Sequence, residues 1–187
     1  MINLDPNRPV RFCPYCGGAV IERVVSGRPR PHCPACQQTF FADPKLAVAV
    51  LIDVDGQLVL QRRAIEPGLG RWSFPSGFVE RGERVEDAAI REAREEVGLD
   101  VRLTRLLGLY SESGNPVVLA VYLAEPIGGT LHADHDENDA VGLFSPDALP
   151  DLAFSHDHAI IADWRALRRA ASTPAHHPHE TNSDHAG

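Results

Sequence analysis

The pattern of apolar positions first marks a pair of strands near the centre of the chain. Residues 45–54 form an almost continuous aliphatic and β-branched run, which is typical of a strand buried on both faces. Asp55-Gly56 follows directly, and this dipeptide favours a tight hairpin turn. We therefore expect residues 57–62 to return as the antiparallel partner.

An apolar stripe with a spacing of four residues predicts a helix between Gly82 and Gly98. Four residues make up this stripe: Val85, Ala89, Ala93 and Val97. Gly98 is expected to end the helix, because glycine readily adopts the left-handed conformation of a C-terminal cap.

The remaining pattern predicts three more strands and one more helix. The strands are expected at residues 101–110, 117–124 and 142–144, and the helix at about residues 158–169. Residues 171–187 contain almost no large apolar side chain. Burial therefore cannot offset the entropy of ordering them, and they are expected to form a disordered tail.

Length and composition allow one ordinary hydrophobic core with a small appendage. The chain has 187 residues, of which 43% are hydrophobic, and a formal net charge of -8. This charge argues against broad electrostatic capture of nucleic acid or of an anionic membrane. The longest apolar run, residues 46–52, is too short to cross a membrane, and residues 1–5 lack the layout of a signal peptide. We therefore expect a soluble cytoplasmic protein.

The four cysteines form two Cys-x-x-Cys pairs with sixteen residues between them, at Cys13, Cys16, Cys33 and Cys36. This spacing is typical of a zinc ribbon, expected over residues 10–44, with a hairpin supplied by residues 19–26. Two disulfides are the alternative, which the cytoplasm disfavours. Four thiolates leave no open position on the metal, so the zinc is expected to be structural.

Three carboxylates converge at the edge of the predicted helix. Glu92 and Glu96 lie one turn apart, with Glu95 beside them. Like charges at this spacing repel, and a divalent cation would reverse the sign of the interaction. Oxygen ligands without His or Cys select magnesium, manganese or calcium over zinc. The alternative is a solvated acidic face that is interleaved with arginines.

Residues 77–99 read GFVERGERVEDAAIREAREEVGL and resemble the Nudix box at its fixed positions. Ala93 is smaller than the aliphatic residue that is common there. The resemblance implies an α+β Nudix fold, a mixed β-sheet sandwiched between helices, over residues 45–170. It also implies that Glu92, Glu95 and Glu96, with the carbonyl of Gly77, hold Mg²⁺ or Mn²⁺. Glu83 and Arg91 lie about two helical turns apart and are expected to form a bracing ion pair.

The catalytic base of related enzymes often comes from outside the box, and the acidic loop at residues 132–139 is a candidate source. Glu137 is our choice within it, although a solvated surface loop is an equal alternative. Arg62 and Arg63 are candidates to meet phosphate oxygens, and Trp72 to stack on a base or flavin. For Trp72, a place in the core is the alternative.

The box preceded by a four-cysteine ribbon resembles the Nudix branch that acts on ADP-ribose and FAD. This implies hydrolysis of the pyrophosphate bond in a nucleoside diphosphate linked to another group, releasing two monophosphates. The alternatives are an NADH pyrophosphatase, although its downstream SQPWPFP signature is absent, and a sanitising hydrolase of nucleoside triphosphates. A non-catalytic ADP-ribose sensor is a further alternative. The expected partner is a nucleotide rather than a nucleic acid, and the chain could form a homodimer.

Overall fold

The computed structural model describes residues 10–172, and the chain divides into two compact units. One unit contains the chain up to Leu46 together with Ser111–Val118. The other contains Ala47–Tyr110 and the chain from Leu119 onward. The expected tail at residues 171–187 lies outside the described residues from position 173.

The smaller unit is built on a two-stranded antiparallel hairpin, β1 (Ile21–Val25) and β2 (Arg28–His32). Ser26 and Gly27 form the turn, with φ angles of 51° and 74°. The hairpin was expected at residues 19–26, which include β1 but not β2. The Ser-Gly pair, which tolerates positive φ, turns the chain where the expected segment ends.

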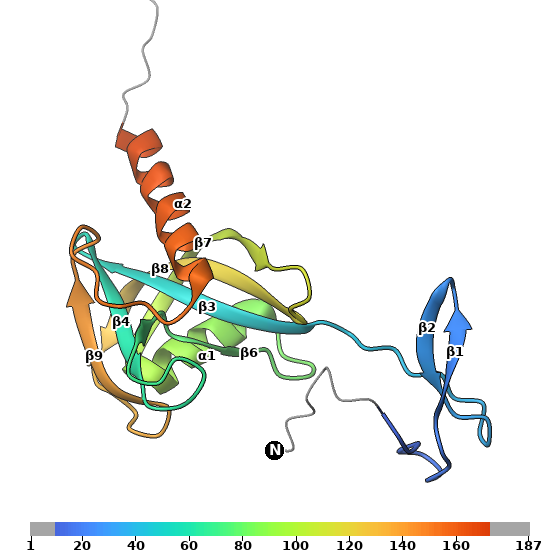
Figure 1. Ribbon diagram of the computed structural model, residues 1–187. Coiled ribbons are helices and arrows are strands. Elements are labelled where there is room, and N and C mark those ends of the chain that lie inside the picture. The colour runs from blue at the N-terminus through green and yellow to red at the C-terminus, as the bar shows by residue number, and fades with distance from the viewer. Residues whose placement is uncertain (1–9, 173–187) are drawn as a thin grey trace, which may run out of the picture. The chain divides into compact units, whose positions relative to one another are not determined.

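The larger unit contains a seven-stranded mixed sheet (Figure 1). Strand order is β5-β4-β3-β8-β7, while β6 pairs with β3 and β9 pairs with β4. The strands are β3 (Lys45–Val54), β4 (Gln57–Arg63), β5 (Trp72–Ser73), β6 (Ser76–Phe78), β7 (Leu99–Ser111), β8 (Val117–Gly129) and β9 (Asn138–Phe144). Each strand expected from the apolar pattern is present, and several extend beyond the expected ends.

The central hairpin confirms the prediction from the apolar run. Residues 47–52 of β3 are all buried, and β4 returns antiparallel to it with Val54 opposite Gln57. Asp55 and Gly56 have φ angles of 51° and 86°, as a tight hairpin turn requires. Burial of each large aliphatic side chain here contributes about 1.5–3 kcal/mol relative to exposure.

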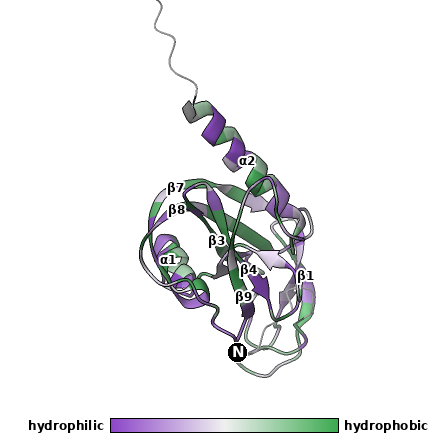
Figure 2. Ribbon diagram, turned by 90° about the vertical axis from the view of Figure 1, so that its left-hand side faces the viewer, coloured by the Kyte–Doolittle hydropathy of each residue, from purple (hydrophilic) through white to green (hydrophobic). Residues whose placement is uncertain are grey.

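Two helices lie on opposite sides of this sheet, α1 (Val85–Val97) and α2 (Ser155–Ser172) (Figures 1 and 2). Gly98 caps α1 in the left-handed conformation with φ 71°, as expected. The second helix is longer at both ends than its apolar pattern predicts. In its first turn the amide of Phe154 donates to Asp157 Oδ2 at 3.0 Å, which holds the start of the helix. None of the helices within residues 10–172 is long and apolar enough to span a membrane.

Candidate active site and metal centre

Two of the three glutamates in the last two turns of α1 are buried. Glu92 is 9% exposed and Glu96 is 4% exposed, whereas the side chain of Glu95 is 59% exposed. Ala89 and Ala93 of the apolar stripe are fully buried, and Glu92 and Glu96 follow each of them at a spacing of three. The inward face of α1 therefore carries two carboxylates beside its apolar residues.

Glu96 is fixed by two hydrogen bonds to one of its oxygens. Gln61 Nε2 on β4 donates to Glu96 Oε2 at 2.7 Å, and the amide of Ser76 donates to the same atom at 2.6 Å. Burial raises the pKa of Glu96 to about 8, against these two donors, and the charges of Glu92 and Glu137 add to the rise. The carboxylate thus sits where its negative charge is poorly solvated.

A buried amide network orients the donor of that bond. Asn138 Nδ2 donates to Gln61 Oε1 and to the main-chain carbonyl of Glu96, both at 2.7 Å. Gln61 is 1% exposed and Asn138 is fully buried. Neither residue was predicted from the sequence. The one signal was for Gln61, a polar residue that directly follows the apolar residues of β4.

Glu92 lies directly against the backbone of Gly77. Gly77 is on β6 opposite Val48 of β3, and a Cβ atom added to it would overlap the Glu92 carboxylate. Burial raises the pKa of Glu92, although the neighbouring Arg91 opposes the rise. The glycine therefore permits a carboxylate and a main-chain segment to approach each other closely.

The guanidinium of Arg91 forms ion pairs with three glutamates, Glu83, Glu92 and Glu95. It pairs with both oxygens of Glu83 at 2.9 and 3.0 Å, with Glu92 at 2.7 Å and with Glu95 at 3.0 Å. Its Nη2 also donates to the carbonyl of Phe78 at 3.2 Å. The hydrogen bond from Arg91 lowers the pKa of Glu83 to about 2. The expected pair between Glu83 and Arg91 is confirmed, and it is part of a wider cluster.

Glu137 is exposed and lies on the loop before β9, directly before the buried Asn138. Burial is the main cause of the raised pKa of Glu92 and of Glu96, and the charge of Glu137 adds to it. Asp134 Oδ1 accepts the amides of Asp136, Glu137 and Asn138 at 2.9, 3.0 and 3.2 Å. The carbonyl of Glu137 also accepts the amide of Ala64 at 2.8 Å. The loop that contains Glu137 is therefore held by the hydrogen bonds to Asp134 and by the backbone hydrogen bond to Ala64.

The three candidate substrate-binding residues have partners within the protein. Arg62 pairs with Asp139 at 2.7 Å. Arg63 Nε donates to the carbonyl of Pro67 at 2.6 Å. Trp72 packs edge-on against Phe144, with ring centroids 4.6 Å apart. The structure does not bring these side chains together with the buried glutamates through any direct contact within residues 10–172.

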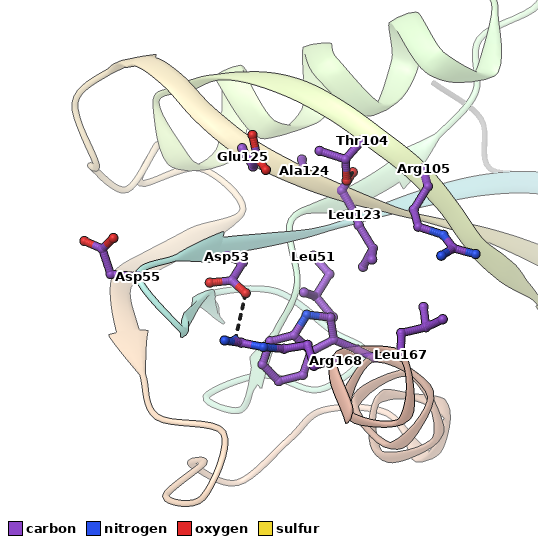
Figure 3. Close-up of a pocket in the computed structure, with 11 residues that line it drawn as sticks. Leu51, Asp53, Asp55, Thr104, Arg105, Leu123, Ala124, Glu125, Leu167 and Arg168 are labelled. Carbon is purple, nitrogen blue, oxygen red and sulfur yellow. Dashed lines mark hydrogen bonds and ion pairs between the residues drawn. The ribbon is translucent and has the colours of Figure 1, made fainter. Parts of the chain in front are cut away.

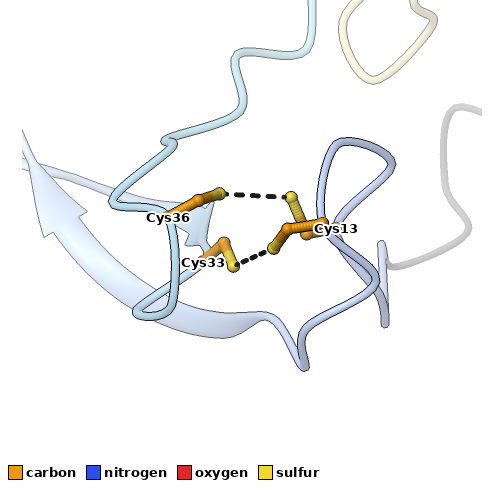
Figure 4. Close-up of side chains that lie close together, drawn as sticks. Cys13, Cys33 and Cys36 are labelled. Carbon is orange, nitrogen blue, oxygen red and sulfur yellow. Dashed lines mark hydrogen bonds between the residues drawn. The ribbon is translucent and has the colours of Figure 1, made fainter.

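The four cysteine sulfurs converge in the smaller unit (Figure 4), where they all lie within 4.8 Å of one another. Cys13 and Cys36 are 3.5 Å apart, as are Cys16 and Cys33, and all four are free thiols. Tetrahedral zinc with bonds of about 2.3 Å requires sulfurs roughly 3.8 Å apart. The donor set therefore fits zinc, and the four cysteines are positioned to form a zinc site.

A separate cavity of about 470 Å³ lies between the sheet and α2 (Figure 3). Residues from β3, β7, β8 and α2 line it, including Leu51, Thr104, Leu123 and Arg168. Asp53 and Arg168 form an ion pair of 3.0 Å at its wall. None of the glutamates of α1 lines this cavity, so it is distinct from the carboxylate cluster.

The comparison with protein families identifies the fold around these carboxylates. The NUDIX domain matches residues 43–164. This chain belongs to the Nudix family. It is therefore a Nudix pyrophosphohydrolase, and the family uses divalent metal ions.

The alignments with several known proteins span most of this chain. An ADP-ribose pyrophosphatase of Methanocaldococcus jannaschii is 38% identical over 128 residues, which are 66% of this chain and 75% of that protein. The NAD-capped RNA hydrolase NudC of Chromobacterium violaceum is 34% identical over 76% of this chain, but the match spans just 52% of that protein. The crystal structure of a NUDIX hydrolase from Nitrosomonas europaea superimposes with a TM-score of 0.80 at 31% identity, covering 90% of this chain and 97% of that one.

Proposed function

We propose that this Nudix enzyme hydrolyses the pyrophosphate bond of ADP-ribose, FAD or a related dinucleotide and releases two monophosphates. The observation that carries the proposal is the pair of buried carboxylates on α1, with Glu92 against the backbone of Gly77 and Glu96 bound to the amide of Ser76. The 38% identity to an ADP-ribose pyrophosphatase supports this class of substrate.

The ligands for a catalytic metal are oxygen atoms on α1 and β6. Glu92 and Glu96, with Glu95 and the carbonyl of Gly77, would hold Mg²⁺ or Mn²⁺, because hard oxygen donors select these ions. When bound, such an ion neutralises the phosphates and lowers the pKa of a water. Gln61 and the Ser76 amide both donate to Glu96 Oε2, so Oε1 is the oxygen of Glu96 that would bind the ion.

Glu137 is the proposed general base. It takes a proton from the attacking water, whose oxygen forms a bond to one phosphorus while the bridging P–O bond breaks. The bond pair leaves with the other phosphate, so one monophosphate gains the water oxygen and the other keeps the bridging oxygen. Arg62, Arg63 and Trp72 lie on β4 and β5 and are proposed to meet substrate, which requires Arg62 to exchange its Asp139 partner for phosphate.

A product assay tests the proposal. Purified protein with magnesium is offered ADP-ribose, FAD, NADH and a nucleoside triphosphate, and the products are identified by mass. We expect AMP with ribose 5-phosphate from ADP-ribose, or AMP with FMN from FAD. Release of inorganic pyrophosphate from the triphosphate alone would instead identify a sanitising hydrolase.

A second candidate is hydrolysis of NADH or of an NAD cap on RNA. The 34% identity to a NudC protein favours it, and the absence of the SQPWPFP stretch counts against it. Formation of AMP and reduced nicotinamide mononucleotide from NADH, faster than cleavage of ADP-ribose, would support this candidate.

The remaining proposals concern the structural metal, the cellular location and the oligomeric state of the enzyme. Four free thiols suit a structural Zn²⁺ in a reducing compartment, and we propose a cytoplasmic location. A homodimer is proposed as well, because the edge strand β7 exposes Leu106 and Leu109. Light scattering during gel filtration distinguishes a dimer from a monomer.

A further inference from the structure

The hairpin of the smaller unit gathers three arginines on one face. In its register Arg23 lies opposite Arg30, and Val25 lies opposite Arg28. Side chains directly opposite each other in a sheet share a face, and so do residues two apart on one strand. Arg23, Arg28 and Arg30 therefore project from the same side of β1 and β2.

Neither β1 nor β2 places an acidic residue on this face. Glu22 is the one carboxylate in the two strands, and it lies on the opposite face because it is adjacent to Arg23. Within residues 10–172 none of the three arginines forms an ion pair with a carboxylate, although Arg23 approaches His32 Nε2 at 3.5 Å. Like charges placed directly across a sheet are destabilising.

An exposed aromatic ring accompanies the cationic face. The guanidinium carbon of Arg30 lies 4.3 Å from the centroid of the Phe41 ring. Phe41 nevertheless remains 56% exposed. Arg30 Nε is buried and has no hydrogen-bond partner in the described part of the chain. The face thus combines unneutralised arginines with a ring that is free to stack.

We propose that this hairpin face binds single-stranded nucleic acid. Arginines that lack carboxylate partners can neutralise phosphates and release counterions. An exposed ring beside them can stack on an unpaired base, which a duplex does not offer. The net charge of -8 for the whole chain predicts weak capture by the protein overall, so the attraction is local to the three arginines.

Fluorescence anisotropy with a labelled single-stranded RNA tests the proposal on the full, zinc-loaded chain. The RNA has a 5′-hydroxyl end and hence no pyrophosphate bond, so the result is independent of the proposed hydrolysis. Each arginine that contacts a phosphate contributes roughly 0.7 to the slope of log affinity against log salt, or about fivefold at 0.1 M salt. The double variant Arg23→Gln/Arg28→Gln is therefore expected to bind about 25-fold more weakly, with a shallower salt slope.

The matched control is Arg102→Gln/Arg105→Gln, which removes the same charge from two exposed arginines on β7. It should bind as the parent does. Phe41→Leu should lose about fivefold in affinity while keeping the parent's salt slope, because it removes stacking alone. Zinc content and circular dichroism verify that each variant is folded.

Three outcomes would overturn the proposal. The first is equal affinity of the Arg23→Gln/Arg28→Gln variant and the parent. The second is an equal loss of RNA affinity in the Arg102→Gln/Arg105→Gln control, which would show that the RNA responds to the net charge of the whole protein. The third is duplex RNA bound as tightly as the single strand, with no effect of Phe41→Leu.

Discussion

Gln61 Nε2 donates a 2.7 Å hydrogen bond to Glu96 Oε2 and thereby joins strand β4 to helix α1. Asn138 holds the other end of the Gln61 amide, so the direction of the bond is fixed. The carboxylate is held in place before any ligand arrives. Such preorganisation is what a site for a charged transition state requires.

The first prediction concerns the two buried glutamates. Glu92→Gln and Glu96→Gln should each lower kcat/KM at least about 100-fold, because the amide keeps the shape of the side chain and loses the charge that binds metal. Thermal unfolding of Glu96→Gln without magnesium should not occur at a lower temperature, since the amide oxygen can keep both hydrogen bonds that Glu96 Oε2 accepts. Activity within about a factor of two of the parent for both variants would show that the metal site is elsewhere.

Gly77→Ala should abolish most activity although it adds one carbon. Its Cβ would overlap the Glu92 carboxylate, so the carboxylate must move away from the Gly77 backbone. Gly108→Ala is the matched control, because its nearest neighbour lies 3.4 Å from the added Cβ. Steady-state kinetics over a range of magnesium concentrations measure the effect. Parent-like kinetics for Gly77→Ala would contradict this geometry.

Asn138→Ala should destabilise the larger unit. It leaves Gln61 Oε1 and the Glu96 carbonyl without their donor, which costs about 1–3 kcal/mol for each buried group. We expect a loss of about 2 kcal/mol or more in the free energy of unfolding, measured in urea. The control is Glu125→Ala, which breaks an exposed ion pair that contributes less than about 1 kcal/mol. Equal stabilities of the two variants would count against the network.

Asp157 should make stability depend on pH. Burial raises its pKa from 3.8 to about 7, against the amide of Phe154 and the charge of Arg63. The folded chain therefore keeps a proton that the unfolded chain has already lost. This stabilisation is fully present below the unfolded value and disappears as pH rises through about 7.

Asp157→Asn should remove that dependence while keeping the hydrogen-bond acceptor for the helix start. Between about pH 5 and pH 7 the variant should gain stability relative to the parent, by at most about 1.4 kcal/mol per pH unit. Urea unfolding at several pH values measures the difference. A difference that stays constant across this range would mean that Asp157 is ionised throughout.

Replacing Cys13 and Cys16 by serine should prevent zinc binding and unfold the segment that carries the four cysteines and the hairpin β1–β2. The larger unit has its own core of buried strands, so it should keep part of its hydrolase activity once magnesium is supplied. Elemental analysis of the parent should find about one zinc per chain. Disulfide-paired cysteines in freshly purified protein, with no zinc, would refute the assignment.

The sequence predicted local features well because each depends on neighbouring residues. Asp55-Gly56 determined the central hairpin, and the four-residue stripe with Gly98 determined the extent of α1. Both are confirmed. The Nudix family and fold were predicted from residues 77–99, a continuous segment whose spacing is its signature.

The sequence could not predict contacts between distant segments. Gln61 and Asn138 are 77 residues apart, and neither belongs to a motif, so nothing local indicated their hydrogen bond. The second helix begins at Ser155, earlier than expected, where the amide of Phe154 donates to Asp157 Oδ2. The cationic face of the hairpin also required the register, since a turn longer by one residue would place Arg23 and Arg30 on different faces.

Arg91 links the loop of the Nudix box to its helix α1. One guanidinium joins Glu83 and Phe78, which precede α1, to Glu95 near its end. An arginine keeps its charge at every pH at which the protein folds. The loop that contains Phe78 and Glu83 therefore cannot open unless Arg91 on α1 loses its hydrogen bonds to both residues. The loop and α1 form a single cooperative unit, and their amide hydrogens should exchange with solvent together.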